Sequence, residues 1–259
     1  MSSTKAPNRG GKAVAQARGA NSNRKATIIG VLIVALLAAV VVGFVVYSSK
    51  QRDSAATAAI PVVSTGITGV PVAFDEPTGT VVVGKDTAPK TVDVYEDFLC
   101  PVCGKFESTY GSQIQDGLTS GKLKVRYHVL NLLDKQSTPA GYSLQSANAA
   151  LAVAKNNPAK FPDFHASLFG AQPREGGPGY TTDQLVGLGQ SLSIGGSYEQ
   201  DVRGGTFDNT VKAAFQKAST DPALQRTDAG QSYFGTPTVA ADGKLLDNNN
   251  PNWLKDLIG

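Results

Sequence analysis

The stretch that decides the fold runs from Val92 to Glu107 and reads VDVYEDFLCPVCGKFE. Its first residues favour a β-strand and its last residues open a helix, so the CPVC motif of residues 100–103 lies where a strand gives way to a helix. Cys100 and Cys103 are the only cysteines of the chain. Two thiols at this spacing can close a small disulfide ring, and the free N–H groups at a helix start favour a thiolate.

The two thiols are expected to play different roles. Cys100, nearer the helix start, is the candidate reactive sulfur, and Cys103, one turn further on, is the candidate resolving sulfur. Between them lies the dipeptide Pro101-Val102, and Pro101 suits a first helical turn because its missing N–H would be unpaired there. A site that stabilises the thiolate also stabilises the reduced form, which makes the disulfide a stronger oxidant. The motif therefore predicts thiol–disulfide exchange.

Three plainer interpretations of the CPVC motif stay open: half of a zinc site, a structural disulfide, or chance. A structural zinc site needs four ligands, and the sequence has no second CxxC motif. The only histidines, His128 and His165, are too far apart in the sequence to form a close pair of ligands. We therefore expect no metal site, and the exchange chemistry requires no bound cofactor.

The positive charge of the chain is concentrated at its N-terminus. The formal net charge is +3, but residues 1–25 hold six basic residues and no acidic one, so the remainder carries about −3. Nucleic-acid binding is therefore not expected. The Ser-, Asn- and Gly-rich composition of residues 1–25 predicts a disordered cytoplasmic tail.

Residues 26–47 read ATIIGVLIVALLAAVVVGFVVY and carry no charge. A helix of about 22 residues can cross the ~30 Å hydrocarbon layer, so this segment is predicted to be a transmembrane anchor. A cleaved signal peptide stays the alternative, although its apolar region is normally shorter. The basic residues before the segment predict a cytoplasmic N-terminus and place the rest of the chain outside the cell membrane, where disulfides persist.

The remaining chain divides into a tether and one folded domain. Residues 48–74, rich in Ala, Ser, Thr and Gly, are interpreted as a tether. Residues 75–259 are expected to fold, with strands around the CPVC motif, a helical insertion over about residues 136–228, and further strands near the end. Within them, Thr181 to Gln184 predicts a capped helix start, and Asp242-Gly243 predicts a hairpin.

This order of elements resembles the DsbA-type thioredoxin-fold oxidoreductases, most of all the membrane-anchored members of Gram-positive, especially actinobacterial, cell envelopes. The matching residues are Gly84, Ala88-Pro89, Val92, Asp97-Phe98, Cys100-Pro101, Cys103-Gly104, Phe106-Glu107, Tyr127-His128-Val129 and Gly235-Thr236-Pro237-Thr238. The resemblance covers about residues 75–259 and implies an α/β thioredoxin fold with a helical insertion, here preceded by the transmembrane helix.

The resemblance also implies roles for the segment Gly235-Thr236-Pro237-Thr238. Thr236–Pro237 would be a cis peptide against the CPVC disulfide, and the backbone of Thr236 would pair with a substrate strand. A proline that only bends an edge strand is the alternative.

Two residues depart from the family pattern. Many relatives have a buried glutamate where this chain has Val94. Glu96 lies on the same face of the strand and is a possible proton relay. A solvated surface position for Glu96 is the alternative. Val102 stands where the strongest oxidants of the family have histidine, so a weaker oxidant is expected.

Together these features predict an extracytoplasmic enzyme that introduces disulfides into reduced exported proteins. The resemblance implies a quinone-linked membrane partner, of the DsbB or vitamin K epoxide reductase homologue type, that reoxidises the dithiol. Two alternatives stay open: a disulfide reductase or isomerase with the same dithiol, and a non-catalytic envelope binding module in which the motif forms only a structural bridge.

Overall fold

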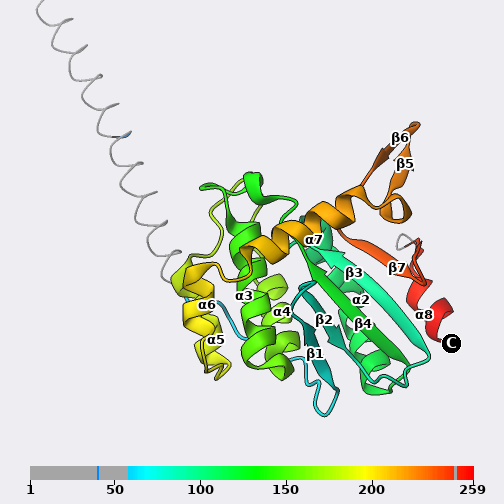
Figure 1. Ribbon diagram of the computed structural model, residues 1–259, viewed down its shortest axis with the longest axis horizontal. Helices are drawn as coiled ribbons and strands as arrows, with labels where there is room; N and C mark the ends of the chain where they lie inside the picture. The colour runs from blue at the N-terminus through cyan, green and yellow to red at the C-terminus, as the bar shows by residue number, and fades with distance from the viewer. Residues whose placement is uncertain (1–39, 41–57, 248–249) are drawn as a thin grey trace, which may run out of the picture. The chain divides into compact units, whose positions relative to one another are not determined.

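The computed structural model describes residues 40, 58–247 and 250–259 (Figure 1). The predicted tail over residues 1–25 and the predicted anchor over residues 26–47 lie outside the described residues, apart from Val40. Within the part that is described, no helix combines the length and the apolar composition that a membrane crossing requires.

A mixed sheet of six strands forms the centre of the domain, in the order β1-β2-β4-β3-β7-β8. The strands are β1 (Val72–Asp75), β2 (Thr80–Val83), β3 (Lys90–Glu96), β4 (Leu123–Val129), β7 (Thr238–Ala241) and β8 (Lys244–Leu245). β3 and β4 pair in parallel, and the other neighbours pair antiparallel. β3 lies between β4 and β7, so the CPVC motif that follows it lies at the end of a central strand of the sheet.

Helices surround this sheet (Figure 1). They are α2 (Pro101–Thr119), α3 (Tyr142–Asn156), α4 (Phe161–Gly170), α5 (Thr182–Ser191), α6 (Tyr198–Gly204), α7 (Asp208–Thr220) and α8 (Trp253–Ile258). Helices α3 to α7 lie between β4 and β7 in the chain, which confirms the predicted helical insertion. Its C-terminal boundary falls earlier than residue 228, because Arg226–Asp228 forms β5, which pairs with β6 (Gln231–Tyr233) in a separate hairpin.

Two local predictions are confirmed in detail. At the start of α5, the N–H of Gln184 donates to Oγ1 of Thr181 (3.2 Å), and the N–H of Thr181 donates to Oε1 of Gln184 (2.9 Å). Between β7 and β8, Asp242 and Gly243 adopt left-handed backbone angles, with φ of 50° and 72°. Such angles are those of a tight hairpin turn, in which Asp-Gly is favoured.

The tether predicted over residues 48–74 is wrong for its described part. Ile60 is buried in the core, with 3 % of its surface exposed. Oδ1 of Asp163 accepts hydrogen bonds from both the N–H and Oγ1 of Thr65, each at 2.8 Å. The described residues from 58 onward belong to the compact domain. The polar, small-residue composition predicted flexibility, but one apolar side chain enters the core and two backbone donors bond to side chains of α4.

Candidate active site

The CPVC motif lies at the junction of β3 and α2, as predicted. Cys100 is the N-cap of α2, with an extended backbone (φ −70°, ψ 115°), and Pro101 opens the helix. The N–H of Gly104 donates to the carbonyl oxygen of Cys100 at 3.1 Å. Both cysteines are free thiols, with 5 % of Cys100 and none of Cys103 exposed. Val102 is 61 % exposed, so the dipeptide presents an apolar side chain at the surface.

The loop before β7 lies against Cys100, although it follows 136 residues later in the chain. Sγ of Cys100 donates to the carbonyl oxygen of Thr236 at 3.3 Å. The peptide between Thr236 and Pro237 is cis, as the resemblance implied. The Thr236-Pro237 segment therefore meets the CPVC motif at Sγ of Cys100, with a backbone carbonyl and a residue without an N–H beside it.

The pKa values of the two thiols are shifted in opposite directions. The hydrogen bond with the Cys103 thiol is the largest cause that lowers the pKa of Cys100, to about 6. The N–H groups of Val102 and Cys103 lower it further, against the effect of burial. Burial raises the pKa of Cys103 well above its usual value, and the hydrogen bond to Cys100 and the charge of Glu96 add to this rise. At pH 7, Cys100 is therefore about nine-tenths thiolate and Cys103 is a thiol.

Gln172, which sequence analysis did not single out, holds the turn that leads into α2. Its Nε2 donates to the carbonyl oxygens of Phe98 (3.0 Å) and Cys100 (2.8 Å). A Cβ atom at Gly104 would lie 2.3 Å from Oε1 of Gln172, so glycine leaves room for this contact. Gln172 belongs to no motif and lies far along the chain, so no local signal could have identified it.

Replacing Gln172 with methionine should destabilise the reduced domain by about 1–2 kcal/mol, because two carbonyl oxygens at the motif lose their donor. In a domain of this size that corresponds to a decrease in Tm of about 2–6 °C, measurable by calorimetry. Gln190→Met, at an exposed position of α5, is the matched control and should leave the Tm unchanged. Equal Tm values for the two variants would contradict the role given to Gln172.

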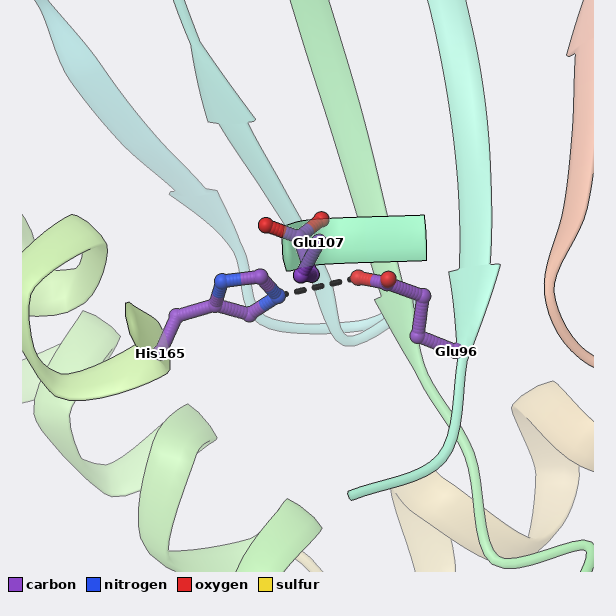
Figure 2. Close-up of side chains that lie close together, drawn as sticks. All are labelled: Glu96, Glu107 and His165. Atoms are coloured by element: carbon purple, nitrogen blue, oxygen red, sulfur yellow. Dashed lines mark hydrogen bonds and ion pairs between the residues drawn. The ribbon is translucent and has the colours of Figure 1, made fainter. Parts of the chain in front are cut away.

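Three titratable side chains, two buried and one partly buried, converge from separate elements (Figure 2). The charge of one of them, Glu96, acts on Cys103. Glu96, the last residue of β3, is 1 % exposed, which excludes the surface position considered for it. Nε2 of His165, on α4, lies 2.9 Å from Oε2 of Glu96. Glu107, on α2, brings a carboxylate oxygen close to both of them. Sequence analysis singled out Glu96 alone for proton transfer, because only the packing of α2 against α4 brings the other two side chains together beside it.

Burial disfavours the charged forms of all three groups.

 Burial raises the pKa of Glu96 to about 8 and that of Glu107 to about 8, and the charge of Glu96 adds to the rise at Glu107. Burial lowers the pKa of His165. At neutral pH the carboxyl groups therefore retain a proton, and the imidazole is neutral.

The same three side chains are the one group in the described part of the chain whose donor atoms approach closely enough for a metal ion to bridge them. These atoms lie within 4.8 Å of one another. Two of them, Nε2 of His165 and Oε2 of Glu96, are already joined by a hydrogen bond. The absence of a metal cofactor stays a prediction.

Asp97 fixes the segment between β3 and α2. Its carboxylate accepts hydrogen bonds from the N–H of Leu99, the N–H of Leu133 and Oγ of Ser143, each at 2.8 Å. The side chain is fully buried, and burial raises its pKa to about 6. Asp97 thereby joins the turn before Cys100 to the loop after β4 and to α3.

His128 lies in β4, as predicted for a strand residue. Its Nε2 is 2.8 Å from Oδ1 of Asp93, and its ring stacks on Tyr95 with the ring centroids 4.2 Å apart. Asp93 and Tyr95 alternate with Glu96 along β3 and so face the other side of the sheet. There they line a cavity of about 420 Å³ together with residues of α7. His128 is therefore separated from the cysteines by the sheet.

Comparison with known proteins gives consistent matches. A family model described as thioredoxin matches residues 76–259. Disulfide bond formation protein D of Bacillus subtilis is 31 % identical over 174 residues, which cover 66 % of this chain and 71 % of that protein. Serine/threonine-protein kinase PknE of Mycobacterium tuberculosis is 34 % identical over 183 residues, which cover 69 % of this chain and 31 % of the kinase. The chain thus spans about a third of the length of the curated kinases that it matches.

Solved structures show the same fold. MdbA, a thiol-disulfide oxidoreductase from Corynebacterium matruchotii, has a TM-score of 0.59 at 24 % identity, over 74 % of this chain and 92 % of that one. Oxidised BdbD from Bacillus subtilis has a TM-score of 0.56 at 26 % identity, over 74 % of this chain and 97 % of that one. Oxidised DsbA of Mycobacterium tuberculosis has a TM-score of 0.57 at 24 % identity, over 73 % and 93 % of the two chains.

Proposed function

Because the chain belongs to the thioredoxin family, and within it to the DsbA-type thiol-disulfide oxidoreductases, we propose that it introduces disulfides into exported proteins outside the cell membrane. The observation that carries this proposal is the opposite shift of the two thiol pKa values. A stable Cys100 thiolate favours the dithiol over the disulfide, so the oxidised enzyme readily accepts electrons from substrate thiols.

The exchange proceeds in two steps. A substrate thiolate attacks Sγ of Cys100 in the oxidised enzyme; the bond to Cys103 breaks, and Cys103 leaves and takes up a proton. A second substrate thiolate then attacks the substrate sulfur of the mixed disulfide, and Cys100 leaves as a thiolate. Two electrons pass from the substrate thiols to the enzyme, and Cys100 is a good leaving group because its pKa is about 6.

Thr236 and Pro237 are proposed to hold the substrate over Cys100. The Thr236 carbonyl oxygen already accepts a hydrogen bond from Sγ of Cys100, so a strand that pairs with this backbone brings its own sulfur to the same place. Proline at position 237 leaves no competing N–H beside the sulfurs.

The location and the reoxidising partner are proposed from the sequence. The uncharged segment over residues 26–47, with basic residues before it, supports a single-pass anchor with a cytoplasmic N-terminus. A quinone-linked membrane protein would accept the electrons of the dithiol, and the anchor would keep the domain near it. The sulfur atoms carry the electrons themselves, so no bound cofactor is needed.

Cells that produce the full chain with Cys103→Ala should accumulate disulfide-linked complexes, because the mixed disulfide loses its resolving thiol. Non-reducing electrophoresis followed by mass spectrometry would detect them. The Cys100→Ser/Cys103→Ala double variant is the control and should form none.

Two outcomes of this experiment would contradict the proposal. If the Cys103→Ala chain forms no complexes through Cys100, the chain does not act on protein thiols. If the wild-type chain rests mainly as the dithiol in cells, it acts as a reductase or isomerase instead.

A further inference from the structure

A hairpin of two strands connects the helical insertion to the segment that contacts Cys100. Its strands, β5 and β6, pair with each other and with no other described strand, and they extend away from the central sheet (Figure 1). The turn between them consists of Ala229 and Gly230, with φ of 47° and 80°, which are angles of a tight two-residue hairpin turn. Because only two residues separate the end of β6 from Thr236, the hairpin leads directly into the loop at Sγ of Cys100.

Arg226, the first residue of β5, ties the hairpin to this loop. Its Nη2 donates a hydrogen bond to the carbonyl oxygen of Pro237. The carbonyl oxygen of Thr236, one residue earlier, accepts from Sγ of Cys100 at 3.3 Å. Two successive carbonyl groups therefore contact the hairpin and the reactive sulfur. A hydrogen bond from a guanidinium is among the stronger ones in proteins, so it opposes movement of the loop relative to the hairpin.

Tyr233, the last residue of β6, lies directly opposite Arg226 in the hairpin, so both side chains are on the same face. Both reach Gly235, where a Cβ atom would lie 3.8 Å from Cε2 of Tyr233 and 4.0 Å from Nη1 of Arg226. The next residue, Phe234, packs edge-on against Tyr95 of β3, with the ring centroids 6.2 Å apart. Tyr233 is instead 47 % exposed, and it is the one exposed aromatic side chain in the described part of the chain.

An apolar residue is exposed in each of the two segments that meet at Sγ of Cys100. Val102 follows that cysteine in the CPVC motif, and Tyr233 precedes the Thr236 loop. Cysteine is among the most buried residue types of folded proteins, so the cysteines of an unfolded chain have apolar neighbours that are not yet buried. An exposed aromatic ring beside the reactive sulfur is suited to contact such neighbours.

We propose that Arg226 and Tyr233 select the substrate: the ring of Tyr233 contacts an apolar side chain next to the substrate cysteine, and Arg226 is the positioning residue that holds the Thr236-Pro237 backbone for the same segment. The partner is thus an extended segment of an unfolded exported protein, with an apolar residue beside its cysteine. The inference rests on the proposed function and names the kind of substrate. Because Arg226 fixes the loop in advance, binding does not have to order it.

Oxidation of two synthetic dithiol peptides by the oxidised full chain tests the role of Tyr233. Both cysteines are flanked by leucine in one peptide and by serine in the other, and dithiothreitol is the reference. Each dithiol passes two electrons to the Cys100–Cys103 disulfide and becomes a disulfide itself, which acid quenching and mass spectrometry follow. Tyr233→Ser should slow the leucine peptide about tenfold and change the other two rates by no more than about twofold. Val62→Ser, at an exposed apolar residue of the N-terminal segment, is the control.

Arg226→Met should slow both peptides about tenfold, because the loop that pairs with them is no longer held. Oxidation of dithiothreitol should change by no more than about twofold, since this small thiol does not pair with the backbone. Arg226→Lys keeps a charged donor and should recover part of the loss. Arg203→Met, at an exposed position of α6, is the matched control and should alter no rate.

Each role can fail separately. If Tyr233→Ser slows the leucine and serine peptides equally, or slows neither, the ring does not select apolar neighbours. If Arg226→Met slows dithiothreitol as much as the peptides, or Arg226→Lys is as slow as Arg226→Met, the guanidinium does not position the loop for substrate. A wild type that oxidises neither the peptides nor dithiothreitol would instead refute the proposed function, so the two failures are distinguishable.

Discussion

At pH 7, iodoacetamide should alkylate Cys100 at least about 100-fold faster than Cys103, because only the thiolate reacts. Cys100 is about nine-tenths ionised at this pH, since its pKa is about 6. The pKa of Cys103 is raised well above its usual value, which leaves less than about one per cent as thiolate, and its sulfur is buried. Peptide mass spectrometry of the labelled, reduced protein from pH 4 to pH 9 measures both rates.

The pH profile of this labelling tests the cause of the shift. The Cys100 rate should be half-maximal near pH 6. In Cys103→Ala the midpoint should rise, because the hydrogen bond that lowers the Cys100 pKa most is lost. Cys100→Ser should reduce total labelling at pH 7 by the same factor of at least about 100. A midpoint near that of an ordinary thiol, or equal labelling of both cysteines, would remove the basis of the proposed function.

Replacing Asp97 with asparagine should destabilise the domain by about 3 kcal/mol, because one carboxylate oxygen becomes an NH₂ donor that faces an existing donor. All three partners of Asp97 donate to it, so neither orientation of the amide satisfies them. Denaturant unfolding of the reduced domain gives the change in free energy. Asp86→Asn is the matched control, because the Asp86 side chain is fully exposed, and it should change the stability by less than about 0.5 kcal/mol.

The Asp97 variant also tests how the turn supports the sulfurs. Asp97 accepts a hydrogen bond from the N–H of Leu99, the residue before Cys100. Loss of its carboxylate should therefore loosen the start of α2 as well as lower the stability of the domain. If Asp97→Asn were as stable as Asp86→Asn, water would be satisfying the three donors in place of the carboxylate, which would contradict the burial of this site.

Local sequence signals predicted the parts of this protein that depend on neighbouring residues. The CPVC motif at a strand-to-helix junction, the capped start of α5 and the Asp-Gly hairpin all follow from backbone preferences over a few residues. The contact between Cys100 and Thr236 spans the whole helical insertion, and only the resemblance to a family placed it.

The features that sequence analysis missed depend on packing between distant elements. Glu107 and His165 reach Glu96 because α2 and α4 pack against each other. Gln172 reaches the motif from the end of α4. The error over the tether has the same origin, since an average composition cannot show that Ile60 enters the core.

The segment before β1 has a mechanical consequence. Oγ of Ser167 accepts a hydrogen bond from the N–H of Val63 (2.9 Å), and Oδ1 of Asp163 accepts two from Thr65. These two attachment points lie on either side of His165 along α4. Tension applied to the chain before residue 58 would be resisted first by the hydrogen bond from Nε2 of Gln184 to the carbonyl oxygen of Ala58 and by the buried Ile60. It would then reach the helical turn that carries the imidazole, before any strand of the sheet is strained.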